Sequence, residues 1–230
     1  MSRTRVRPTA PRPIQLPAQL ESPREHELDE LGHRSVLEQS RIADVDLAHR
    51  DMTGSTWQQV VAENVKLANS DLTGAFLTDI RFDASDLANL AARGASIQRV
   101  EFIGGRSLGL GVNEGMLQDV TFEDCQLDFA SMRFAKLQRV VFRRCRMHEF
   151  DLSSSQLQSV LFDDCDMSGA DLTRVTFERC ELRSTVLENV RGVQDLDGVA
   201  MSMVDVVELA PLFASACGVN ILAHDAADDD

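Results

Sequence analysis

Residues 95–102 read ASIQRVEF, and nearly the same pattern returns at intervals of twenty residues: GMLQDVTF at 115–122, AKLQRVVF at 135–142 and SQLQSVLF at 155–162. A repeat this short cannot bury its own apolar face, so consecutive repeats must stack on one another. If residues i and i+20 lie one above the other at the strand spacing of about 4.8 Å, the phenylalanines of the pattern form one buried core stack. These are Phe82, Phe102, Phe122, Phe142 and Phe162.

A shorter period of five runs through the same region, from Leu37 to Leu187. Every fifth residue there is large and apolar, except Ala62, Ala92 and Ser107. Helices repeat at about 3.6 residues and strands at about 2, so neither accounts for this pattern. A second inward position, two residues earlier, carries mostly small or apolar side chains. The two periods predict a solenoid with four units per coil, about eight coils and a length of about 37 Å.

Units such as Ser70-Asp71-Leu72-Thr73-Gly74 and Ala170-Asp171-Leu172-Thr173-Arg174 resemble the A(D/N)LxX repeat of the pentapeptide-repeat family. The resemblance implies an all-β fold, a right-handed quadrilateral parallel β-helix. No insertion breaks the phase, so the chain is similar to the plain-rod, quinolone-resistance members of the family. Those members are understood to imitate DNA when they bind gyrase, and to dimerise through a C-terminal helix.

Prolines indicate where the repeats begin and end, because proline cannot donate to a hydrogen-bonded ladder and all six lie outside the repeats. We expect the β-helix to span 35–194. Before it, residues 1–34 form a basic Pro/Arg-rich arm, expected to be partly disordered, with a short helix or turn near 25–33 that covers the first coil. An acidic tail occupies 225–230.

Residues 195–224 are expected to form a C-terminal helical cap, which could also be a dimerisation element. Pro211 predicts a kink or two short helices, and Gly218 is a reasonable stop. Several residues could share one apolar helix face: Val204, Val207, Leu209, Leu212, Phe213 and Cys217. The residues proposed for the cap or dimer contact are Val207, Leu209, Leu212 and Phe213.

The sequence alone does not determine two features of the interior. The glycine-rich segment 103–115 follows no phosphate-loop pattern, and we expect a complete but irregular coil face there. Four large residues occupy the small inward position of one face, where they either widen the face or turn outward: Arg50, Leu90, Leu110 and Phe150.

The sequence predicts no catalytic, cofactor-binding or metal-binding residues, and therefore no enzyme and no cofactor. None of the five histidines lies in metal-ligand spacing with another histidine or cysteine. Cys125, Cys145 and Cys165 fall at stacked inward positions, where a free thiol acts as a small apolar group; a disulfide among them is conceivable, but nothing indicates an oxidising compartment. Without an apolar run long enough to be a signal or a membrane span, we expect a cytoplasmic location.

The net charge is −14, but the rod is not uniformly acidic. At several outward positions, acidic and basic residues alternate from one coil to the next. Such cross-strand pairs stabilise a sheet by roughly 0.2–1 kcal/mol each. The alternating rows are Glu123, Arg143, Asp163 and Arg183; Asp124, Arg144 and Asp164; and Arg99, Asp119 and Arg139. They leave a basic belt of Arg133, Lys136, Arg139, Arg143, Arg144 and Arg146. The candidate partner surface comprises Asp44, Asp46, Asp51, Asp71, Asp79, Asp83 and Asp86, with Arg143 and Arg144 of the belt.

These observations predict a non-enzymatic, scaffold-like protein-interaction rod. The alternative is a dimeric DNA mimic that binds DNA gyrase or another type II topoisomerase and modulates fluoroquinolone sensitivity. Both alternatives involve a protein partner and neither requires a membrane or direct contact with nucleic acid. A basic belt would contribute to the first function and oppose the second.

Overall fold

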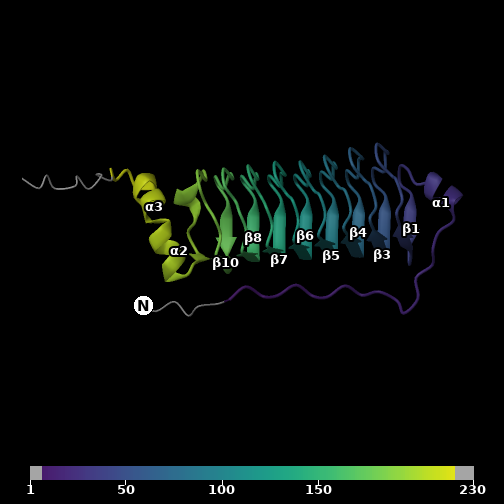
Figure 1. Cartoon of the computed structure of the whole chain (residues 1–230), viewed down its shortest axis with the longest axis horizontal. Helices are drawn as coiled ribbons and strands as arrows, with labels where there is room; N and C mark the ends of the chain where they lie inside the picture. The colour runs from purple at the N-terminus through teal and green to yellow at the C-terminus, as the bar shows by residue number, and fades with distance from the viewer. Residues whose placement is uncertain (1–6, 221–230) are drawn as a thin grey trace, which may run out of the picture.

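The computed structural model describes residues 7–220 and shows a parallel β-solenoid with helices at both ends (Figure 1). Each full coil contributes one long strand that crosses two consecutive repeat units. The strands are β1 (Val36–Glu38), β2 (Arg41–Ala43), β3 (Thr56–Glu63), β4 (Phe76–Asp83), β5 (Ser96–Ile103), β6 (Met116–Glu123), β7 (Lys136–Arg143), β8 (Gln156–Asp163), β9 (Thr176–Glu178), β10 (Cys180–Arg183) and β11 (Val199–Ala200).

Neighbouring strands pair in parallel with a register of twenty residues, which confirms the stacking predicted from the sequence. Phe102, for example, pairs with Phe122, and Phe122 pairs with Phe142. The sheet runs from β1 and β3 through β8 to β10 and β11. The register changes only at the last step, where Cys180 pairs with Val199, because the repeats have ended.

The period of five comes from the backbone, since nearly every fifth residue adopts the left-handed conformation. Asp44, Asn64, Asp79 and Asn89 are examples, with φ between 50° and 56°. Asn and Asp tolerate this region better than other side chains with a Cβ. The aspartate that precedes many central apolar residues closes the same turn: Asp71 accepts the backbone N–H of Thr73 at 2.8 Å.

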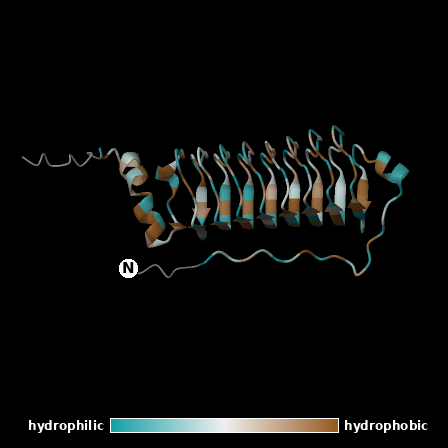
Figure 2. Cartoon of the chain, viewed as in Figure 1, coloured by the Kyte–Doolittle hydropathy of each residue, from teal (hydrophilic) through white to brown (hydrophobic). Residues whose placement is uncertain are grey.

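The core follows the two inward positions, and hydrophobic and hydrophilic residues alternate along the strands (Figure 2). The phenylalanine rings of the stack lie nearly parallel, with centroids 4.5–5.2 Å apart between successive coils. Trp57 is fully buried and lies 6.3 Å from the Phe82 ring. Ala62 occupies the phenylalanine position of the same coil and is small. The large Trp57 side chain compensates for the missing volume, which explains one exception to the period of five.

The large residues at small inward positions behave in two ways. Leu90, Leu110 and Phe150 point inward, with exposed fractions of 4%, 2% and 0%. Leu90 and Leu110 belong to the same coils as the undersized Ala92 and Ser107, so volume is compensated within the coil. Arg50 instead turns toward the N-terminal helix and donates to the carbonyl oxygen of Leu28 at 2.6 Å.

The glycine-rich segment 103–115 is a regular coil, which corrects the expectation of an irregular face. Its turns and bridges repeat those of the coils before and after it. Gly104 and Gly109 adopt the positive φ that other residues adopt at the same turns. The glycines therefore fit the coil geometry without distorting it.

Helices cover both ends of the solenoid. At the first coil, α1 (Glu25–Asp29) and the turn after it bury Leu28 and Leu31. At the last coil, the 3₁₀ turn η1 (Val193–Asp195) leads through β11 to α2 (Met203–Glu208) and α3 (Ala210–Ala216). Pro211 lies in the first turn of α3, in agreement with a break into two short helices. The tail proposed for 225–230 lies outside the described residues.

The C-terminal helices do not share one apolar face, contrary to expectation. Leu209, Leu212 and Phe213 pack against the core of the solenoid. Val204 and Val207 are 66% and 65% exposed, with Val204 beside a hollow between α2 and the last coil, and Cys217 is also exposed. Because the chain turns at Leu209, residues on either side of it lie on different helix faces. Within residues 7–220, no helix has the length and apolarity to span a bilayer.

Candidate interaction surface

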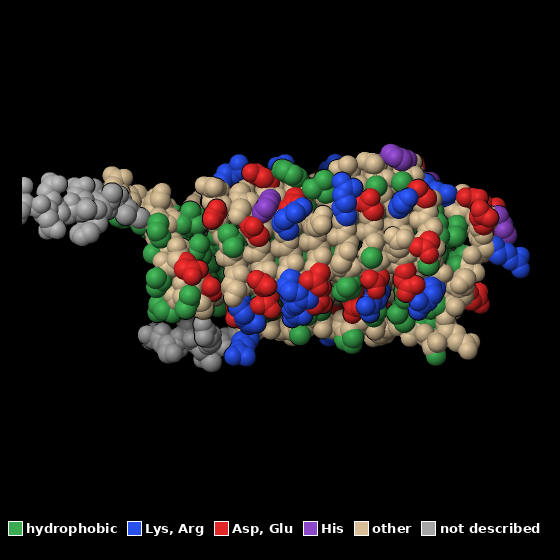
Figure 3. Space-filling view, viewed as in Figure 1, with side chains coloured by type: hydrophobic (Ala, Val, Ile, Leu, Met, Phe, Trp, Pro, Cys, Tyr) green, Lys and Arg blue, Asp and Glu red, His purple; other side chains and the backbone are tan. Residues whose placement is uncertain are grey.

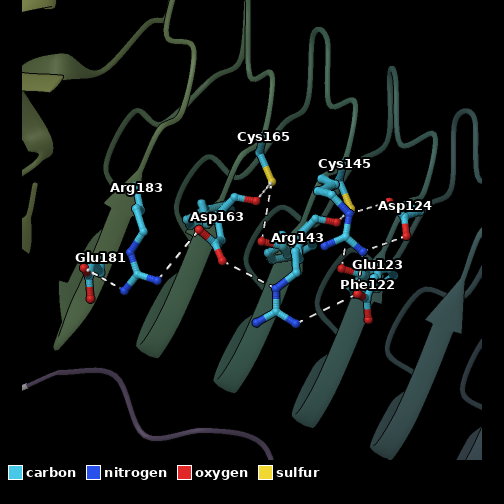
Figure 4. Close-up of polar contacts among 12 residues, drawn as sticks. Phe122, Glu123, Asp124, Arg143, Cys145, Asp163, Cys165, Glu181 and Arg183 are labelled. Atoms are coloured by element: carbon cyan, nitrogen blue, oxygen red, sulfur yellow. Dashed lines mark hydrogen bonds and ion pairs between the residues drawn. The ribbon is translucent and has the colours of Figure 1, made fainter. Parts of the chain in front are cut away.

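Most outward charges lie in paired ladders. The first joins Glu123, Arg143, Asp163 and Arg183 across successive coils (Figure 4), with nitrogen to oxygen distances of 4.0, 3.4 and 3.8 Å. The side chains are 22–47% exposed, so water screens each pair. The ladder therefore acts mainly to hold the coils in register.

A tighter contact lies beside this ladder, where Arg144 bridges two carboxylates. Its guanidinium lies 2.5 Å from Glu123 and 2.7 Å from Asp124. Hydrogen bonds that Arg144 donates to these carboxylates raise the pKa of Arg144, and those to Asp124 lower the pKa of Asp124. The acidic and basic side chains are interleaved along the rod (Figure 3).

The basic belt is therefore largely neutralised. Five of its six members form ion pairs, and Lys136 forms none within residues 7–220. The partners are Asp151 for Arg133, Asp119 for Arg139, Asp163 for Arg143, Asp124 for Arg144 and Asp128 for Arg146. The belt is thus weaker as an obstacle to a DNA-binding partner than the sequence suggested.

The candidate acidic residues of the N-terminal coils divide into three kinds. Asp46, Asp83 and Asp86 have a basic partner 3.5–3.7 Å away. Asp51 and Asp71 close Asx turns with Thr53 and Thr73. Hydrogen bonds from Thr53 lower the pKa of Asp51. Asp44 is exposed and accepts from the Asn64 amide at 2.7 Å.

Asp79 does not belong to this exposed surface, which corrects the sequence-based assignment. Its side chain is 5% exposed. Both of its oxygens accept from the Arg99 guanidinium, at 2.6 Å from Nε and 2.7 Å from Nη2. Two coils further along, Asp119 makes the same bidentate contact with Arg139, at 2.5 and 2.7 Å, and its side chain is 1% exposed.

These residues occupy the same corner in five successive coils, which we call the corner row: Gln59, Asp79, Arg99, Asp119 and Arg139. Each has a positive φ of 52–58°. Burial by itself raises the pKa of Asp119, but hydrogen bonds from Arg139 and from the Arg12 backbone outweigh it and lower the pKa. The Asp119 carboxylate is therefore held ionised in a buried position.

The N-terminal arm covers the corner row. Residues 7–20 run along the solenoid toward its first coil (Figure 1), and the first six residues of the arm lie outside the described part of the chain. The Arg12 backbone N–H donates to Asp119 Oδ1 at 3.0 Å, and the Gln15 N–H donates to Asp79 Oδ1 at 2.9 Å. The Gln59 amide donates to the Gln15 carbonyl oxygen at 3.2 Å. All three contacts use backbone atoms of the arm.

Sequence reasoning missed this contact, although a signal for it exists. Five half-buried apolar residues of the arm recur every three residues, at Pro8, Pro11, Ile14, Pro17 and Leu20; Leu16 is half-buried as well. Three is the period of a polyproline II helix. The acidic residues of the corner row recur every two coils, so the two patterns can be matched only after the spacing of the coils is known.

A second exposed surface lies at the C-terminal end. Met203, Val204 and Val207 are 65–77% exposed on α2. A hollow of about 910 Å³ separates the last coil from the helices, lined among others by Thr185, Leu187, Val204 and Leu212. The two helices therefore cap the core only in part.

The described part of the chain contains neither a cluster of metal-binding side chains nor a disulfide. Residues 7–220 contain no group of three or more histidine, cysteine or acidic side chains placed to hold a metal ion. All five cysteines are free thiols. Cys125 donates to the carbonyl oxygens of Phe102 and Glu123 at 3.3 Å, the same arrangement found at Cys145 and Cys165.

Comparison with known families agrees with the coil geometry. A family model described as pentapeptide repeat region matches residues 95–172, and one described as pentapeptide repeats (8 copies) matches residues 40–79. The chain belongs to the pentapeptide-repeat family. A comparison with curated proteins gave no match.

Solved structures of pentapeptide-repeat proteins are similar over most of their length. A trypsin-treated variant of QnrB1, a plasmid-mediated fluoroquinolone resistance protein, is 16% identical, with 84% of this chain and 95% of that chain covered and a TM-score of 0.41. HetL from the cyanobacterium Nostoc, involved in heterocyst differentiation regulation, is 13% identical, with 73% and 90% covered and a TM-score of 0.33.

Proposed function

We propose that this pentapeptide-repeat protein is a non-enzymatic interaction rod with a scaffold role. The observation that carries the proposal is that the flank of the rod already binds an extended polypeptide segment through the backbone of Arg12 and Gln15. The ladders hold the coils in register, so the rod offers a stiff surface on which a second chain can lie. Its site of action is proposed to be the cytoplasm.

Affinity capture with the full chain as bait, followed by reconstitution from purified components, tests this proposal. A partner that binds saturably, and binds the double variant Arg143→Glu and Arg144→Glu more weakly, would support a scaffold that uses the basic belt. The variant must first be shown to fold, because it places like charges beside Glu123 and Asp163. Failure to reconstitute any saturable complex would contradict the proposal.

The second candidate function is a dimeric DNA mimic that binds DNA gyrase or another type II topoisomerase. It is supported by the net charge of −14 and by three of the candidate surface carboxylates that form no ion pair within residues 7–220, those of Asp44, Asp51 and Asp71. The apolar side chains of Met203, Val204 and Val207 would supply the dimer contact. The interleaved charges of the middle coils favour the first candidate, because a duplex presents a continuous negative charge.

A supercoiling assay separates the two candidates. Purified gyrase from the same source is titrated with the full chain, with and without a fluoroquinolone. Inhibition at low micromolar protein, or less drug-induced cleavage, would favour the DNA mimic, and Asp44→Lys should then weaken the effect. No effect at high molar excess would eliminate that candidate and leave the scaffold proposal.

A further inference from the structure

The corner row and the arm match each other in spacing. Arg12 and Gln15 are three residues apart, and their acceptors Asp119 and Asp79 are two coils apart. Three residues of a polyproline II helix advance by about 9.3 Å, and two coils advance by about 9.6 Å. The mismatch is small enough for both contacts to form without stretching the arm.

Apolar residues, three of them proline, recur along the arm at this period of three. The half-buried positions of this period are Pro8, Pro11, Ile14, Pro17 and Leu20; the residues between them are exposed except Leu16, which is also half-buried. Each N–H that binds a carboxylate comes immediately after one of these apolar residues. Proline therefore occupies positions that need no donor, and non-proline residues occupy the two that do.

Recognition depends on the backbone and not on particular side chains. Arg12 and Gln15 are exposed residues whose main-chain N–H groups make the contact. The acceptors are fixed before the arm arrives, because each carboxylate is held by two bonds from the arginine one coil further on. A different segment with the same spacing can make the same hydrogen bonds.

We propose that the corner row is a binding site for an extended, proline-containing segment of a partner protein, in which two free backbone N–H groups lie three residues apart, as at Arg12 and Gln15. Residues 7–20 occupy the site as a competitor from the same chain. The proposal rests on the proposed interaction-rod function and names the chemistry of its partner. Because the arm is tethered, its high effective concentration keeps the site closed until a partner competes for it.

The test uses the full chain with a matched pair of variants. Arg12→Pro with Gln15→Pro removes both N–H donors and places a ring carbon where each hydrogen pointed at a carboxylate. Arg12→Ala with Gln15→Ala removes the side chains but keeps both donors. The probe is a fluorescent synthetic peptide with the sequence of residues 7–20, and fluorescence anisotropy measures its binding.

We expect the proline variant to bind the peptide at least tenfold more tightly than the wild type or the alanine variant. A second peptide, with proline at positions 12 and 15, should not bind the proline variant. Circular dichroism and thermal unfolding must show that the solenoid of each variant is intact, which is expected because the arm contributes none of the coils.

Two results would overturn the proposal. One is the absence of saturable binding to a folded proline variant, and the other is equal binding of the two peptides. Either result leaves the interaction-rod function standing if a reconstituted partner binds wild type and proline variant alike. Conversely, if the peptide binds but no protein partner can be reconstituted, the corner row is a peptide site and the scaffold role fails.

Discussion

Arg139 donates from Nε and Nη2 to both carboxylate oxygens of Asp119, one coil away, and both side chains are mostly buried. Removal of one partner from such a pair leaves an uncompensated buried charge. The same Asp119 oxygen that binds Arg139 Nε also accepts the Arg12 backbone N–H. The pair thus joins two adjacent coils and the N-terminal arm.

We expect Arg139→Met to lower the free energy of unfolding by about 3 kcal/mol, because Asp119 then remains buried without its cation. Urea unfolding followed by circular dichroism measures the loss. Arg144→Met is the control, since its pair is more exposed and should cost clearly less. Equal losses in the two variants would contradict the special role of the buried pair.

Phe122→Ala should destabilise the chain by about 3–5 kcal/mol, since it opens a cavity in the middle of the phenylalanine stack. The Phe122 ring lies 4.5 Å from that of Phe102 and 4.9 Å from that of Phe142, and the side chain is fully buried. Phe129→Ala provides the comparison, because Phe129 is 63% exposed. Thermal and urea unfolding should show little change for it; a loss like that of Phe122→Ala would count against the buried stack as the source of stability.

Ser107→Ala should raise the free energy of unfolding by about 1 kcal/mol. The Ser107 hydroxyl is buried and makes no hydrogen bond within residues 7–220, so its desolvation is uncompensated. Ser70→Ala is the matched control. The Ser70 hydroxyl donates to the Leu47 carbonyl oxygen at 2.8 Å and accepts from the Arg50 N–H, so its removal should be destabilising. Opposite signs for the two variants are the outcome to look for in urea unfolding.

Stability should decline in acid. Hydrogen bonds hold the pKa of Asp119, Asp166 and Asp171 below the usual 3.8, despite burial that acts in the opposite direction. A carboxyl whose folded pKa is depressed stabilises the fold above its unfolded pKa of about 3.9, and this contribution is lost as pH falls through the folded pKa.

Urea midpoints measured between pH 7 and pH 3 check this expectation. They should change little down to about pH 5 and fall below about pH 4. A rise in stability on acidification would mean that relief of repulsion from the net charge of −14 dominates over loss of the paired carboxylates.

Thiol reactivity should distinguish one cysteine from the other four. Cys217 is exposed, whereas Cys125, Cys145, Cys165 and Cys180 are buried. Burial raises the pKa of Cys180 and so suppresses its thiolate form. A thiol reagent should titrate one group in the native chain and five after denaturation, and Cys217→Ser should abolish the native reaction. Rapid reaction of two or more native thiols would contradict the packing at the inward positions.

The repeat itself could be predicted from the sequence because its determinants are local. A left-handed residue at every fifth position and an apolar residue at the centre of each unit define the coil. The spacing of twenty residues between Phe102 and Phe122 then places them in adjacent strands. The opposite-charge ladders follow from the same register, so the spacing of twenty residues is enough to pair Glu123 with Arg143.

What the sequence determined by itself is the coil, its stacking and its core, because each depends on residues separated by fixed short intervals. The tertiary structure decided that Asp79 is buried, that Arg50 turns toward α1, and that Arg12 binds Asp119 across 107 residues. These outcomes depend on which distant segments meet at the surface of the finished solenoid. That matching requires the spacing of the stacked coils, which is a property of the assembled backbone and not of any one stretch of sequence.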